Sequence, residues 1–182
     1  MSDDEFVLKI TQSASGLTPE ALVVVKEEIE RRKLPSNVLH GLEAQHRKYS
    51  NEELDLYCEI IRSLPCPISG LRNEKLNASL VAEALSFIVI TNHKKYIAIG
   101  NPESLDKINN ASLIRTLLLG WWGLPWGPIK TIQAMLINLN SKKTNHASGP
   151  NDFLRIFVQE HIGEIAAYKD DSDRLFRIIS GC

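Results

Sequence analysis

Residues 117 to 129, with the sequence LLLGWWGLPWGPI, constrain the fold of this chain more than any other stretch. They hold all three tryptophans of the protein, together with two prolines and three glycines. Proline removes a backbone donor and glycine weakens a helix, so a continuous helix through the stretch is excluded. We therefore predict two short helices, residues 111 to 119 and 129 to 138, joined by a tight aromatic elbow.

The apolar stretch is interrupted by Arg115 and Lys130, and the uncharged segment between them is shorter than the roughly 20 residues that a spanning helix needs. Three interpretations stay open. The hairpin forms the buried spine of a domain, or it dips into a bilayer interface with both cations reaching the headgroups, or it presents a surface to another protein. The residues expected to contact a membrane or partner are Trp121, Trp122, Pro125, Trp126, Arg115 and Lys130.

The overall charge is nearly balanced, with 21 basic and 22 acidic residues and a net charge of -1. This balance argues against a nucleic-acid-binding surface and against a polyacidic tail. The first residues are acidic and do not form the basic-then-apolar pattern of a secretory signal, so we expect a cytoplasmic protein, or one at the inner face of the cytoplasmic membrane. Three cysteines, an odd number, do not form a disulfide framework.

The first third of the chain predicts a helical lobe. Thr18 followed by Pro19 is a helix start, and a second helix is expected from residues 37 to 47. Ser50 and Glu53 have the spacing of a capping box before a third helix. Residues 6 to 10 form an apolar run that we interpret as a strand or a leading arm.

A β-hairpin is predicted next, with strands at residues 85 to 91 and 96 to 99 and a turn at 92 to 95. Two short motifs flank it. Cys66-Pro67 precedes Ser69, and Asn101-Pro102 precedes Ser104. A zinc ribbon has paired turns of this spacing, because tetrahedral zinc takes four ligands from two turns. Of the four ligand positions, Cys66, Ser69, Asn101 and Ser104, only the first is a cysteine, so we predict no metal and no cofactor.

These motifs resemble a group of small bacterial proteins of poorly defined function. In that group a helical amino-terminal lobe precedes a two-knuckle zinc ribbon and a GWWGxPWGPIxTIQ segment. The resemblance rests on residues 119 to 133 and 21 to 34, on Cys66-Pro67 and on Asn101-Pro102. It implies a zinc-ribbon hairpin, but the three substituted ligand positions make that ribbon degenerate here.

The remaining chain predicts further helices, one capped by Asn151 or Asp152 and one that closes the chain. We therefore expect a mainly α protein with a small β-hairpin, an α+β fold, in which the degenerate ribbon packs between two helical regions. The expected parts are the amino-terminal lobe (residues 1 to 64), the ribbon hairpin (65 to 110) and the Trp-rich hairpin with the last helices (111 to 182), forming one compact unit.

Motifs of known chemistry are missing from the sequence, including GxxxxGK, GxGxxG, GxSxG and HExxH. We therefore predict a non-enzyme without a small-molecule substrate. The first hypothesis is a protein-binding module, an adaptor or an immunity-type protein, which the Trp hairpin can also hold at the inner membrane. The alternative is a membrane-inserting transport-accessory protein anchored by the same hairpin.

Overall fold

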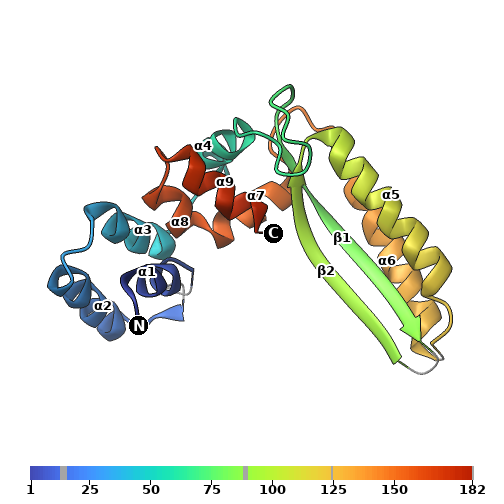
Figure 1. Ribbon diagram of the computed structural model, residues 1–182, viewed down its shortest axis with the longest axis horizontal. Coiled ribbons are helices and arrows are strands. Elements are labelled where there is room, and N and C mark those ends of the chain that lie inside the picture. Colours follow the sequence, from blue (N-terminus) through green and yellow to red (C-terminus); the bar gives the residue numbers. More distant parts are fainter. Residues whose placement is uncertain (13–15, 88–89, 124, 182) are drawn as a thin grey trace. The chain divides into compact units, whose positions relative to one another are not determined.

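The computed structural model describes residues 1–12, 16–87, 90–123 and 125–181. These residues are mostly helical with one antiparallel two-stranded hairpin, which confirms the α+β prediction. The chain forms two compact units (Figure 1). Unit 1 contains residues 1–61 and 155–178, and unit 2 contains residues 62–154 and 179–182.

Unit 1 is built from short helices around an apolar core of Phe6, Val7, Ile10, Ile29, Val38 and Leu42. Its helices α3 and α8 cross closely, because a Cβ on Gly41 would lie 2.5 Å from the carbonyl oxygen of Gly163. Most of the helical residues of this unit belong to α1 (Asp3–Gln12), α2 (Pro19–Arg31), α3 (Ser36–His46), α4 (Asn51–Arg62), α7 (Asp152–Glu160), α8 (Ile162–Ala167) and α9 (Ser172–Ser180).

Two predicted helix starts in unit 1 are confirmed. The Thr18 side chain accepts a hydrogen bond from the Ala21 amide at 3.3 Å, with Pro19 as the first residue of α2. Ser50 and Glu53 bond each other reciprocally, each backbone amide donating to the other side chain. The strand or arm predicted for residues 6 to 10 is wrong. This run lies in α1, because its apolar residues line one helical face against the core.

Unit 2 contains the hairpin of β1 (Asn77–Phe87) and β2 (Ile90–Gly100), paired from Asn77 opposite Gly100 to Phe87 opposite Ile90. The predicted turn at 92 to 95 is wrong, because these residues lie inside β2 and His93 stands opposite Ala84. A polar run marks a turn only when the chain reverses there. Here it forms part of an outer strand of a two-stranded sheet, where polar side chains reach water. The connection at residues 88 and 89 lies outside the described residues.

Two long helices pack along the hairpin, α5 (Pro102–Leu119) and α6 (Trp126–Lys142) (Figure 1). Both predicted helices lie within them, but each real helix is longer. The start of α5 was missed because Asn101 and Pro102 were assigned to a knuckle. The Asn101 side chain instead caps α5 by accepting a hydrogen bond from the Ser104 amide at 3.1 Å.

Candidate functional site

The face that α5 and α6 bury is made of small and polar residues. Its members are Ser104, Asn109, Ser112, Thr116, Gly127, Thr131, Ala134, Asn138 and Ser141, together with Leu105. Buried polar groups are costly unless they are hydrogen-bonded. The composition of this face therefore needs a physical reason, and the neighbouring strand supplies it.

That reason is the edge of β1 that faces away from β2. In an antiparallel ladder every second residue directs its N–H and C=O to this outer side, where they need other partners. The Asn138 carboxamide supplies both, accepting from the Ala82 amide at 3.3 Å and donating to the Ala82 carbonyl at 2.6 Å. The Thr116 hydroxyl accepts from the Ala84 amide at 3.2 Å. The two helices thus close the strand edge with side chains.

Further side chains extend this arrangement along β1. Asn151 donates to the Ala78 carbonyl at 2.6 Å, and the Ser79 hydroxyl donates to Asn109 at 2.8 Å. Asn109 in turn donates to Asn138 at 3.2 Å. Because the polar positions of α5 and α6 are engaged with the strand, the large apolar residues of both helices are left on the opposite side.

This outward side is the apolar face, which consists of large aliphatic residues that are 43% to 63% exposed. Its members are Ile114, Leu117, Leu118, Leu119, Ile129, Ile132, Leu136 and Leu139. Contiguous apolar surface of this kind is uncommon on a protein that has no partner and marks a site of interaction. The sequence carried a signal for it, since the small polar residues recur at three- and four-residue spacing on one side of each helix.

The elbow between the helices continues the apolar face with aromatic rings. Trp121, Trp122 and Trp126 are 40%, 70% and 62% exposed, and Pro125 is exposed beside them. The indole N–H of Trp122 donates to the Leu118 carbonyl at 3.1 Å, which orients one ring at the end of α5. The interpretation of the Trp segment as a buried spine is therefore wrong for the described chain.

Glycine holds this elbow close to the end of β1. A Cβ on Gly127 would lie 2.8 Å from the Gly120 carbonyl oxygen and 3.1 Å from the Ser86 hydroxyl. The same Ser86 hydroxyl donates to the Gly120 carbonyl at 2.7 Å. The backbone of the elbow is thus packed against the strand while the tryptophan side chains point to solvent.

The two predicted cations lie near the elbow but differ in their surroundings. Arg115 pairs with Glu83 at 3.3 Å, and the Ser112 hydroxyl binds the same Glu83 oxygen at 2.9 Å. Lys130 takes part in none of the ion pairs found among the described residues. Burial and the charges of Lys95 and Lys130 lower the pKa of His93, so these cations from β2 and α6 lie near the imidazole.

The four knuckle positions come together in the structure. The Cys66 sulfur is fully buried and lies 3.6 Å from Asn101 Oδ1 and 3.9 Å from Ser104 Oγ, and the Asn101 amide donates to it at 3.4 Å. Burial raises the pKa of the Cys66 thiol, but hydrogen bonds from Ser69 and from the Asn101 backbone outweigh it and lower that pKa.

This cluster contains one cysteine and three neutral oxygen-bearing side chains. Within the described part of the chain, no group of three or more His, Cys, Asp or Glu side chains converges in a way that could hold a metal ion. Asn101 and Ser104 instead contribute to the start of α5. We interpret the cluster as a structural junction between the loop after α4 and the first turn of α5.

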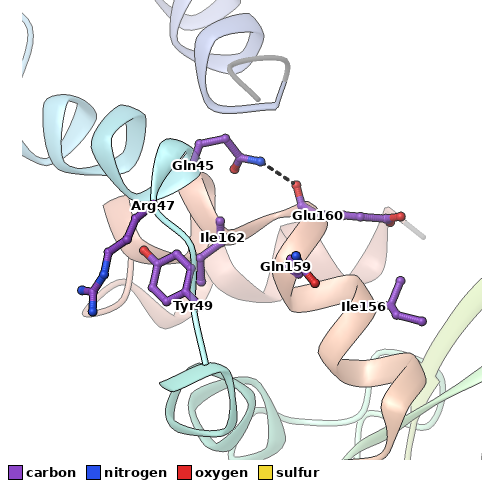
Figure 2. Close-up of a pocket in the computed structure, with 7 residues that line it drawn as sticks. All are labelled: Gln45, Arg47, Tyr49, Ile156, Gln159, Glu160 and Ile162. Carbon is purple, nitrogen blue, oxygen red and sulfur yellow. Dashed lines mark hydrogen bonds between the residues drawn. The ribbon is translucent and has the colours of Figure 1, made fainter. Parts of the chain in front are cut away.

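Unit 1 has a surface hollow of about 490 Å³ between the loop after α3 and helices α7 and α8 (Figure 2). Gln45 lies at one edge and donates to the Glu160 carbonyl at 3.5 Å, and Tyr49 and Ile162 lie beside each other. The one cation there, Arg47, is paired with Glu53 and covers the Tyr49 ring. The lining offers neither a nucleophile with an adjacent base nor a free charge, so it has no features of an active site.

Comparisons with known protein families, with curated proteins and with solved structures found no match to this chain. Among the described residues, none of the helices has both the length and the apolar character needed to cross a membrane. The apolar face and the Trp elbow are therefore the features from which a function must be argued.

Proposed function

We propose that the protein is a non-catalytic module that binds a bilayer surface through the α5–α6 hairpin. The observation that carries the proposal is the inverted hairpin. Its polar groups are engaged with β1, and its large apolar residues and three tryptophans face outward. Helices that lie in a membrane interface have this division, with an apolar face toward the acyl chains.

The elbow supports a bilayer more than a protein partner. Tryptophan combines a large apolar ring with one polar N–H, and for this reason it is enriched at membrane–water interfaces. Arg115 and Lys130 stand at the two ends of the uncharged segment that contains all three rings. Their long side chains can keep the charge at the headgroups while the stems lie along apolar surface. A protein partner would also cover an apolar face, but it would not require cations beside the tryptophans.

Sedimentation with lipid vesicles tests the proposal. The full chain is expected to pellet with vesicles, and its fluorescence, which comes largely from the elbow tryptophans, is expected to shift to the blue on binding. The double change Trp122→Ala and Trp126→Ala should weaken vesicle binding about tenfold or more, because burial of one large apolar side chain contributes about 1.5–3 kcal/mol and 1.4 kcal/mol corresponds to tenfold.

The matched control is Leu56→Ala, which removes a side chain of unit 1 that is 70% exposed, the same fraction as Trp122. This variant should bind vesicles like the unchanged protein. The circular dichroism of both variants should stay that of the unchanged protein, since the removed side chains are on the surface. A wild-type chain that stays in the supernatant with an unshifted emission spectrum would rule out bilayer binding.

A further inference from the structure

The acidic residues are distributed unevenly in unit 2. Residues 84 to 102 and residues 107 to 151 contain no Asp or Glu, although the whole chain carries 22 acidic residues. The first range covers the end of β1 and all of β2, and the second covers most of α5 and all of α6. The part of unit 2 that carries the Trp elbow therefore has almost no negative charge.

Four cations from three elements meet at one level of the hairpin. Lys94 and Lys95 stand on β2 opposite Glu83 and Ala82, and Arg115 of α5 pairs with the same Glu83. Lys130 of α6 is placed there by two observations. Its charge acts on His93, the partner of Ala84, and its neighbour Thr131 lies against Gly120 next to the Ala84 carbonyl. We call Lys94, Lys95, Arg115 and Lys130 the basic collar.

The collar lies close to the Trp elbow. Gly120 and Gly127 bring the elbow against Ala84 and Ser86, and the collar stands at the level of residues 82 to 84 of the same strand. Since a strand rises about 3.3 Å per residue, the two levels are within roughly 10 Å of each other. This spacing suits a chain segment whose rings enter the interface while its cations stay among the headgroups.

The charge of the collar is only slightly offset. Glu83 is its one acidic neighbour among the pairs described above, and that carboxylate is already engaged by Arg115 and by the Ser112 hydroxyl. Lys94 covers the Tyr96 ring, and Lys94, Lys95 and Lys130 form none of the ion pairs found in the described part of the chain. Three cations are thus available to an external anion.

Given the bilayer binding proposed above, we infer that the surface this hairpin recognises is an anionic lipid bilayer, with the basic collar binding the lipid phosphates around the inserted Trp elbow. Anionic leaflets attract basic residues held near their surface, with a gain of about fivefold in binding for each Lys or Arg. Loss of three collar lysines should therefore weaken binding to anionic vesicles about a hundredfold.

The experiment compares the full chain on two kinds of vesicle, phosphatidylcholine alone and equal parts of phosphatidylcholine and phosphatidylglycerol. The test variant carries Lys94→Gln, Lys95→Gln and Lys130→Gln. The control variant carries Lys107→Gln, Lys142→Gln and Lys143→Gln, which makes the same change in net charge. The control lysines interact with Glu103, Asn110 and Asn140, outside the collar.

We expect the unchanged chain to prefer the phosphatidylglycerol vesicles, the collar variant to lose that preference, and the control variant to keep most of it. Equal binding of the unchanged chain to both vesicles would overturn the inference and leave the bilayer proposal in place. An equal loss in the control variant would also overturn it, because net charge and not the collar would then decide. Absence of binding to either vesicle would overturn both, and would indicate that another protein covers the apolar face.

Discussion

Unit 1 and the α5–α6 hairpin of unit 2 bury opposite kinds of side chain. In unit 1 the fully buried positions are apolar, such as Leu42, Ile61 and Ile165. In the hairpin Asn138 and Thr116 are fully buried, while the leucines of the same helices are exposed. The two regions have the same helical periodicity and a similar supply of apolar residues, so the direction of burial is set by something else.

The difference follows from what each helix packs against. The helices of unit 1 pack mainly on other helices, whose backbone groups are satisfied within each helix, so apolar contact is the favourable choice. Helices α5 and α6 pack on a strand edge, whose N–H and C=O groups need partners. Side chains that close a strand edge must be polar, and a helix has only one other side for its apolar residues.

The largest effect that this comparison predicts is on leucine in the two regions. Leu42→Ala should reduce the free energy of unfolding of unit 1 by about 2–5 kcal/mol, because the side chain is fully buried and leaves a cavity. Leu136→Ala on α6 should change stability by less than about 0.5 kcal/mol, because Leu136 is 55% exposed. Urea unfolding followed by circular dichroism measures both.

Equal destabilisation by the two leucine changes would contradict the comparison. It would mean that the apolar face is covered in solution, for example by a second copy of the chain. Repeating the unfolding at several protein concentrations separates this case, since stability that depends on association rises with concentration.

Much of the fold could be predicted from local signals. Helix starts at Thr18 and Ser50 follow from the chemistry of capping, which depends on a few neighbouring residues. The hairpin was expected, but its turn was placed at residues 92 to 95, because a polar run in a strand looks like a loop when the exposed edge is unknown. Register depends on the partner strand, which local patterns do not describe.

The site could be predicted only in part. The spacing of Cys66, Ser69, Asn101 and Ser104 correctly suggested residues that meet, and three of them surround the cysteine sulfur in the structure. The exposure of the tryptophans could not be predicted, because apolar residues usually point inward and only the edge of β1 reverses this here. Lys94 and Lys95 were missed for the same reason as the turn.

The second prediction tests whether Asn138 closes the strand. Asn138→Leu should lower the free energy of unfolding of unit 2 by about 2–4 kcal/mol, since a buried group left without its hydrogen bond costs about 1–3 kcal/mol and Ala82 loses a partner for both its N–H and its C=O. Gln133→Leu is the control, an exposed position on the same helix. It should leave stability nearly unchanged.

Hydrogen exchange gives this prediction a local measurement. In Asn138→Leu the Ala82 amide should exchange faster, whereas in Gln133→Leu its exchange should match the unchanged protein. A leucine at position 138 that preserves both stability and the protection of Ala82 would show that the hairpin tolerates an ordinary apolar core. The account of its inverted faces would then fail.

The third and smallest effect is expected at the elbow. A Cβ on Gly120 would collide with the Thr131 hydroxyl and lie 2.6 Å from the Thr116 carbonyl oxygen, and neither atom belongs to a long flexible side chain. Overpacking of this kind costs about 1–3 kcal/mol, so Gly120→Ala should destabilise unit 2 by that amount. Gly149→Ala, where a Cβ meets nothing within 4 Å, should be neutral in a urea titration followed by tryptophan fluorescence.

The value of the glycine pair lies in separating two causes of the exposure of the tryptophans. If the elbow is held against β1, an added methyl group must push it away, and both stability and vesicle binding should fall in Gly120→Ala. If Gly120→Ala is as stable as Gly149→Ala, the close packing of the elbow does not fix the rings. Their outward position would then be a consequence of the polar positions of α5 and α6 alone, which already direct the apolar side of both helices to the surface.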